Sequence, residues 1–258
     1  MQDGCVLAAT PGPGLIIALV ILVALAITAS LIGQLRQEKA IAVAAGRAVI
    51  QLALVSLIIT AALSQLIWSA VFAAFMFAVA VFTSSRRIEV TRAWPWVALA
   101  MACGLVPTLA VIFASGAIPF NGPSLVPVAG IIIGGTMNAN SLAGRRSFAA
   151  LREEKGCYEA ALSIGLPRAE AITEVIGRRL PEALVPGMDQ TRTVGLVTLP
   201  GAFIGVLLGG GSPIQAGTAQ VLVLFGLLCT QTITIVVAHR FMRTARLLPK
   251  DLQASLQP

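Results

Sequence analysis

The sequence predicts an all-α polytopic membrane protein with about seven transmembrane helices. The chain of 258 residues has a mean hydropathy of +0.90. Only 11% of its residues are charged, whereas a soluble domain carries about 25%. Long uncharged stretches approach the roughly 20 residues that a helix needs to cross the hydrocarbon core of a bilayer. These stretches, taken in order, define the expected spans.

The expected spans follow the apolar stretches of the chain. A tight turn around residues 64–69 divides one long stretch, 48–83, into two spans. Proline and glycine mark turns before the fifth and seventh spans. The complete set is 15–32, two spans within 48–83, 96–115, 125–144, 194–208 and 218–238. We treat the chain, 1–258, as a single membrane domain.

The basic residues predict the orientation. With the N-terminus outside and seven spans, all 18 Lys and Arg fall on one side. Because Lys and Arg concentrate in cytoplasmic loops, that side, with the C-terminus, is expected to be cytoplasmic. The basic excess of seven charges then indicates contact with anionic membrane lipid, and no nucleic acid is expected. The first span lacks a basic region before it and is expected to remain as an anchor.

One cytoplasmic loop, at about 144–191, holds about half of the charged residues. Apolar residues recur in it at helical spacing, first around 151–165 and again over 172–180, with charges between them. The pattern predicts two amphipathic helices that meet at 165–167. Such helices can present one face to a partner protein, or they can rest on the bilayer surface. The pattern alone does not separate these two interpretations.

Several function classes lack support in the sequence. There is no G-x-x-x-x-G-K-[ST] phosphate loop and no H-E-x-x-H motif. The four cysteines show no paired spacing, and the single histidine, His239, is expected at a membrane interface. No carboxylate or lysine lies in the middle of a span, as a proton-coupled carrier would need. We therefore expect no catalytic residues and no cofactor, and metal ligands remain unknown.

Polar residues within the spans are candidates for a translocation path. Small residues and amides recur on the fifth span, where they can either pack helices together or line a polar path. Both interpretations stay open. The candidates are Gln51, Thr136, Met137, Asn138, Asn140 and Ser141.

Several ordered motifs carry a family resemblance. They are G-R-A-V-I-Q-L at 46–52, V-P-V-A-G-I-I-I-G-G-T-M-N-A at 126–139, and A-L-V-P-G-M-D-Q-T-R-T-V-G-L-V-T-L-P-G at 183–201. With E-A-A-x-x-x-G at 159–165, they resemble the bacterial iron-export ABC permease family, the Fet-type permeases, which are related to plant aluminium-tolerance permeases. The E-A-A element corresponds to the loop that docks an ATPase in many ABC permeases. The resemblance assigns ATPase coupling to Tyr158, Glu159, Ala160, Ala161, Gly165 and Pro167.

The resemblance implies a permease subunit in the cell inner membrane that pairs with a separate ABC ATPase, two copies of each. The implied activity is export of iron or another metal ion. Two alternatives remain at this stage. One is an ABC permease for a different solute, such as a sugar nucleotide, and the other is a non-transporting membrane scaffold or regulatory subunit.

Overall fold

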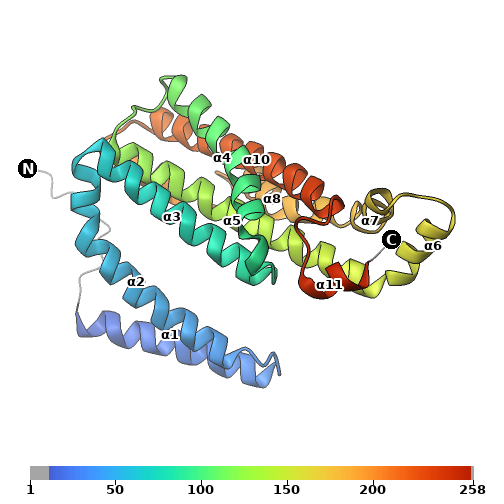
Figure 1. Ribbon diagram of the computed structural model, residues 1–258. Helices are drawn as coiled ribbons and strands as arrows, with labels where there is room; N and C mark the ends of the chain where they lie inside the picture. The colour runs from blue at the N-terminus through green and yellow to red at the C-terminus, as the bar shows by residue number, and fades with distance from the viewer. Residues whose placement is uncertain (1–11, 257–258) are drawn as a thin grey trace, which may run out of the picture. The chain divides into compact units, whose positions relative to one another are not determined.

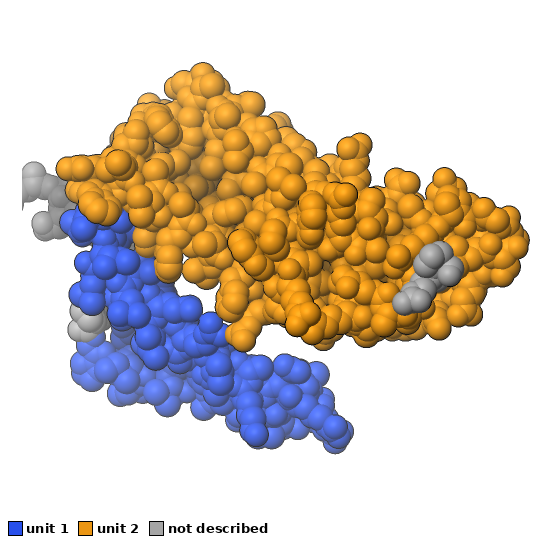
Figure 2. All heavy atoms as spheres, viewed as in Figure 1, with its two compact units in different colours: residues 1–62 blue, residues 63–258 orange. Residues whose placement is uncertain are grey.

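The computed structural model describes residues 12–256 and is almost entirely helical over that range (Figure 1). The chain divides into two compact units, residues 1–62 and 63–258 (Figure 2). Cys103, Cys157 and Cys229 are free thiols, and Cys5 lies outside the described residues. Within residues 12–256 there is no β-strand, only an isolated bridge between Val194 and Thr198.

Six helices in the described part of the chain are long and apolar enough to cross a membrane. The expected fold class is thereby confirmed. The stretch 48–83 is indeed split, because Gln65 adopts an extended conformation (φ −140°, ψ 146°) between two helices. The six are α1 (Pro13–Ile32), α2 (Glu38–Ser64), α3 (Leu66–Arg87), α4 (Trp94–Ala114), α5 (Gly122–Glu153) and α10 (Pro213–Arg243).

The first unit consists of α1 and most of α2. Their connection is closed by Ser30, whose hydroxyl donates to Glu38 Oε1 at 3.0 Å and accepts from the Gln37 amide at 3.2 Å. Apolar side chains cover these helices on all sides, and most are exposed within the chain. A helix that is apolar all round is expected to lie in lipid or against other protein.

The second unit is a bundle of α3, α4, α5 and α10. Helix α3 runs parallel to α5: Gly122 lies against Ser69 near their first turns, and Asn140 donates to Ser84 near the end of α3. Helix α4 runs antiparallel to α10, with the Trp96 ring 5.0 Å from that of Phe241. Helices α3, α5 and α10 all carry arginines in their last turns. We call the end at which these three helices finish the basic end.

The expected sixth span, 194–208, is not a continuous helix. Helices α5 and α10 run in the same direction, so the chain between them must return from the basic end to the opposite end (Figure 1). It returns through α8 (Val185–Thr193), an irregular stretch and α9 (Gly201–Leu208), which packs against α10. Pro200 cannot continue a preceding helix and instead sits before α9 in an extended conformation. At about 1.5 Å per residue, eight residues reach only about 12 Å.

The charged loop contains the two expected helices, α6 (Lys155–Ser163) and α7 (Arg168–Ile176). Its first ten residues, however, belong to α5, which continues to Glu153 instead of ending near 144. Phe148 and Leu151 on this extension are buried, so packing sustains the helix beyond the apolar stretch. The short helices η2 (Leu180–Leu184) and α11 (Lys250–Ser255) complete the basic end, and a 3₁₀ turn, η1 (Thr91–Ala93), precedes α4.

Candidate functional site

The helices α6 and α7, residues 155–176, form what we call the coupling segment. Each buries one face: Tyr158 and Ala161 on α6, and Ile172 and Ile176 on α7. Between them Gly165 adopts φ +93°, a left-handed conformation that glycine accommodates without a Cβ penalty. The Leu166 amide donates to the Ala161 carbonyl at 3.1 Å and closes the end of α6. Local turn chemistry therefore fixes the angle between the two helices.

The predicted coupling residues lie in this segment but not on one face. Tyr158 and Ala161 point inward and support the fold, whereas Glu159 and Ala160 are exposed. Gly165 and Pro167 lie on the exposed turn. The sequence reasoning missed Ile164, a large apolar side chain that is 80% exposed at the same turn. The available signal was an apolar residue directly before the glycine of the E-A-A-x-x-x-G element.

Side-chain contacts attach the coupling segment to the bundle. The Tyr158 hydroxyl donates to the Leu256 carbonyl at 3.3 Å, which links α6 to the C-terminal stretch. Thr173 on α7 lies 3.5 Å from His239 Nε2 on α10. Helix α7 also packs against α5. A displacement of the coupling segment would therefore displace its contacts on both α5 and α10.

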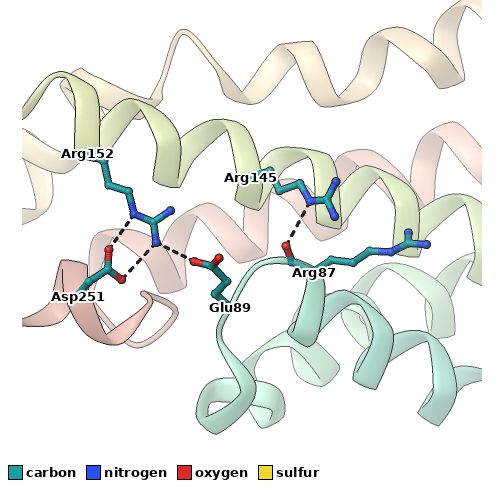
Figure 3. Close-up of polar contacts among 5 residues, drawn as sticks. All are labelled: Arg87, Glu89, Arg145, Arg152 and Asp251. Atoms are coloured by element: carbon teal, nitrogen blue, oxygen red, sulfur yellow. Dashed lines mark hydrogen bonds and ion pairs between the residues drawn. The ribbon is translucent and has the colours of Figure 1, made fainter. Parts of the chain in front are cut away.

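A second group of contacts joins three parts of the basic end around Arg152 on α5 (Figure 3). Its Nη2 donates to Glu89 Oε2 at 2.9 Å, in the connection between α3 and α4. Its Nε donates to Asp251 Oδ2 on α11 at 2.8 Å. The Arg152 guanidinium lowers the pKa of the Asp251 carboxyl below its ordinary value. Close by, Arg145 Nε donates to the Arg87 carbonyl at 3.2 Å.

A partly open pocket with a mixed polar and apolar lining lies in the second unit, between α5, α10 and the return segment that joins them, residues 180–208. Its volume is about 150 Å³. The Nε2 of Gln231, a residue that is only 5% exposed, donates to the Gly135 carbonyl at 3.2 Å, whereas its Oε1 has no hydrogen-bond partner among the described residues. A Cβ at position 187 would collide with that oxygen, so a larger residue there would have to displace the end of the Gln231 side chain. The lining residues are Gly135, Asn138, Ala139, Leu142, Ala183, Pro186, Gly187, Gln190, Leu227 and Gln231.

Asn138 connects this pocket to a positive charge. Its Oδ1 accepts a hydrogen bond from Arg87 Nη1 at 3.0 Å. No ion pair to Arg87 occurs among the described residues, and no carboxylate lines the pocket. Residues 12–256 also contain no group of three or more His, Cys, Asp and Glu residues that could hold a metal ion. The pocket thus offers amides and one nearby guanidinium.

The other predicted path residues lie elsewhere. Asn140 and Ser141 hydrogen-bond to Ser84 on α3, at 2.9 and 3.1 Å. Thr136 is buried, with no partner for its hydroxyl among the described residues. Met137 is half-buried, and Gln51 is exposed on α2 in the first unit.

Of the six candidates, the structure brings Asn138 alone to the pocket. Gly187 and Gln190, which sequence reasoning missed, lie within the V-P-G-M-D-Q motif at 185–190. Gln231, also missed, lies between Thr230 and Thr232, and this polar run within the apolar helix α10 was the available signal.

A polytopic helical bundle with a pocket between its helices and an amphipathic segment at one end is an architecture consistent with a membrane permease. The chain belongs to the uncharacterised protein family UPF0014, whose model matches residues 14–246. It is a multi-pass protein of the cell membrane, as predicted.

Three relatives illustrate the family. The "Probable iron export permease protein FetB" of Escherichia coli is 31% identical over 220 residues, which cover 84% of this chain and 85% of that protein. The "UPF0014 membrane protein STAR2" of Oryza sativa subsp. japonica is 29% identical over 86% of this chain and 79% of its own length. The "Protein ALUMINUM SENSITIVE 3" of Arabidopsis thaliana is 29% identical over 58% of this chain and 55% of its own length. No solved structure matches the chain significantly.

Proposed function

We propose that this chain is the permease subunit of an ABC exporter for iron or another metal ion, acting as a homodimer with a separate ATPase. In this proposal the N-terminus lies outside and the basic end faces the cytoplasm, where the ATPase docks on the coupling segment. Tyr158 and Ala161 hold the segment in place, and Glu159, Ala160 and the turn at Gly165 and Pro167 meet the partner.

The observation that carries the proposal is the continuity of α5 between the pocket and the coupling segment. Asn138 lines the pocket, and the same helix runs without interruption to Glu153, directly before α6. At about 1.5 Å per residue, this part of α5 spans roughly 22 Å. A regular helix of that length transmits a displacement from one end to the other. The return segment, residues 180–208, lies opposite α5 and forms the other side of the pocket. Because it is not a continuous helix, it can move without unfolding a transmembrane span.

The chemistry of the sequence supports a separate source of energy. The sequence contains no phosphate-binding loop, so ATP hydrolysis would be the task of a partner. The exposed Ile164 suits a protein contact, since a few large side chains buried at an interface contribute most of its binding energy.

Iron is supported as cargo by the Escherichia coli relative, which is named a probable iron export permease protein. A different solute is a second candidate, because the described residues hold no cluster of metal-ligating side chains. Both candidates use the same pocket and the same coupling segment.

The test uses inside-out vesicles that contain this permease and the ATPase encoded or co-purified with it. We expect ATP-dependent uptake of radioactive iron, which corresponds to export from the cell. The variant Ile164→Asp should lose ATPase co-purification and uptake while its amount in the membrane stays unchanged. Ala254→Asp, an exposed position on α11 at the same end, serves as the matched control and should keep both. If Ile164→Asp retains both properties, the coupling segment is not the docking site.

A further inference from the structure

Uncompensated positive charge gathers where α4 begins and α10 ends. Several cations of the basic end form ion pairs with Glu or Asp side chains: Arg146, Arg152, Lys155 and Arg179. Within residues 12–256, by contrast, no carboxylate forms an ion pair with Arg92, Arg240, Arg243 or Arg246. All of these four except the half-buried Arg243 are exposed. We call these four arginines, together with Trp94 and Trp96, the arginine patch.

Aromatic contacts hold the arginine patch together. Helix α4 packs along α10 in the opposite direction, so its first turn lies beside the last turn of α10 (Figure 1). There the Trp96 ring contacts Phe241, and the Arg246 guanidinium lies over the same indole, 4.9 Å from the ring centre. Stacking uses the flat face of a guanidinium, so the N–H groups along its edge stay available to an oxyanion. Arg246 is thus positioned by an aromatic ring and not by a carboxylate.

An exposed apolar surface continues from the arginine patch along both helices. On α10, Val236 lies one turn before Arg240, and Phe225 lies farther along the helix; both apolar side chains are exposed. On α4, Leu99 is exposed one turn beyond the exposed Trp94. In a membrane-spanning bundle such side chains face acyl chains, and Trp side chains concentrate at the level of the lipid headgroups. The patch therefore combines positive charge with an apolar surface at the depth of the headgroups.

We propose that the arginine patch is a binding site for an anionic phospholipid, whose acyl chains lie along the exposed apolar side chains of α4 and α10. The guanidinium groups donate charge-assisted hydrogen bonds to the phosphate. The basic excess of the whole chain predicts only a general attraction to anionic lipid, whereas the patch gives that attraction one place. A soluble anion would match the charge but leave the apolar surface unused. The inference is independent of the cargo and of the ATPase.

Lipid binding to the purified permease in detergent, measured by native mass spectrometry, tests the inference. The probes are phosphatidylglycerol, phosphatidylcholine with the same acyl chains, and glycerol 1-phosphate, which has an anionic phosphate but no acyl chains. We expect phosphatidylglycerol to bind at least about tenfold more tightly than either of the others, since each arginine near an anionic headgroup strengthens binding by about fivefold. Phosphatidylglycerol should also raise the melting temperature by mass action.

Two pairs of substitutions separate a site from the net charge of the protein. Arg240→Gln/Arg246→Gln removes two exposed charges of the patch and should weaken phosphatidylglycerol binding by at least about tenfold. Lys155→Gln/Arg179→Gln is the matched control, because it removes the same charge from residues that are paired with carboxylates at the same end. This control should bind within about twofold of the wild type. Size-exclusion chromatography establishes that each variant is folded.

The ring beneath Arg246 allows a test that leaves the charge unchanged. Trp96→Leu removes the aromatic face on which the guanidinium stacks and should weaken phosphatidylglycerol binding by about threefold. Trp96→Phe retains an aromatic face and should bind more tightly than Trp96→Leu. Equal binding by the two variants would mean that stacking does not position Arg246 for the lipid, and would overturn its part in the site.

Several results would overturn the lipid site. Phosphatidylcholine binding as tightly as phosphatidylglycerol would do so, and so would equal losses in the two double variants. Glycerol 1-phosphate binding as tightly as phosphatidylglycerol would mean a site for soluble phosphate. Loss of ATPase co-purification in Arg240→Gln/Arg246→Gln, with phosphatidylglycerol binding intact, would assign the patch to a protein partner. Phosphatidylglycerol binding that depends on the patch, in a permease without ATP-dependent transport, would support the lipid site and overturn only the export function.

Discussion

Arg152 on α5 and Asp251 on α11 form a two-pronged ion pair. Arg152 Nε lies 2.8 Å from Asp251 Oδ2, and Arg152 Nη2 lies 3.2 Å from Asp251 Oδ1. Since Arg152 also binds Glu89, this single guanidinium ties the C-terminal helix to α5 and to the α3–α4 connection (Figure 3). Leu252 and Leu256, buried on either side of the exposed turn of α11, add an apolar contact.

Asp251→Asn is expected to loosen α11 without unfolding the bundle. The pair is partly exposed, with side-chain exposures of 41% for Arg152 and 55% for Asp251, so its contribution is at most about 1 kcal/mol. For a protein of this size the loss corresponds to a fall of roughly 2–4 °C in melting temperature. Glu159→Gln, which breaks an exposed pair within α6, is the control and should change the melting temperature less. Equal effects of the two changes would mean that the pair to α11 has no special role.

The same pair predicts a pH dependence. The pKa of Asp251 is lowered in the folded protein, chiefly by its hydrogen bond to Arg152. A lowered carboxyl pKa gives stability that is complete above the ordinary value of about 4 and is lost as the pH falls through the folded value. The difference in melting temperature between the wild type and Asp251→Asn should therefore be constant near neutral pH and shrink below about pH 4. A difference that grows on acidification would contradict the assignment.

The turn of the coupling segment predicts a graded response at Gly165. Its φ of +93° is rarely adopted by residues with a side chain, least of all by β-branched ones. Gly165→Val should destabilise the segment by about 1–3 kcal/mol, and Gly165→Asn by less. Hydrogen exchange of the 155–176 amides should be fastest in Gly165→Val, slower in Gly165→Asn and slowest in the wild type. ATPase co-purification should be weakest in Gly165→Val and intermediate in Gly165→Asn. No Cβ clash would confuse the result, because the space around Gly165 is open.

The proposed orientation can be tested with single cysteines in a background without the natural ones. Pro123 and Ile214 are exposed at the end opposite the basic end, and Gln253 is exposed on α11. We expect Pro123→Cys and Ile214→Cys to react with an impermeant thiol reagent added to intact cells, and Gln253→Cys to react only after permeabilisation. Labelling of Gln253→Cys in intact cells would reverse the orientation and place the coupling segment outside.

The sequence predicted the fold where composition alone decides it. Uncharged stretches identified the six long helices, and the Gly165–Pro167 turn identified the junction of α6 and α7. Composition could not reveal that 194–208 is interrupted, because the apolar residues there resemble those of a span. Pro200 and the left-handed Gly195 break the helix through their backbone geometry, and the parallel direction of α5 and α10 requires only that the chain between them return.

The pocket was harder to predict, because its residues come from segments far apart in the chain. Asn138 stood out as an amide on a polar stretch of one helix. Gln231 stands between Thr230 and Thr232 within α10, and Gly187 lies in the first turn of α8, but nothing in the local sequence of either residue shows that the two meet. Only their contact across the bundle gives each its role. Conversely, Asn140 and Ser141 share the sequence pattern of Asn138 but hydrogen-bond to Ser84 on α3. Asn140 is rotated by about 200° from Asn138 around the helix axis, whereas Ser141 lies only about 60° away, and its hydroxyl bonds to Ser84 and to the Met137 carbonyl instead of lining the pocket.

Gly187 provides the sharpest test of the pocket. A methyl group there would collide with Gln231 Oε1, so Gly187→Ala should push the Gln231 side chain out of its place or move α8 away from α10. Overpacking of this kind costs about 1–3 kcal/mol. Transport per folded molecule should fall by at least about tenfold, while ATPase co-purification, which depends on the distant coupling segment, should persist. Gly134→Ala is the control, because the space around Gly134 on the neighbouring face of α5 is open.

A second substitution distinguishes a crowded pocket from a general folding defect. Shortening the colliding side chain in Gly187→Ala/Gln231→Ser removes the clash and retains a hydroxyl acceptor on α10. Folded yield and thermal stability should recover toward those of the wild type, whereas transport should recover only in part because serine does not restore the amide that lines the wild-type pocket. Efflux normalised to folded protein is the measurement. If Gly187→Ala transports normally, or if the double variant is no more stable than the single one, the contact between α8 and Gln231 does not shape the transport path.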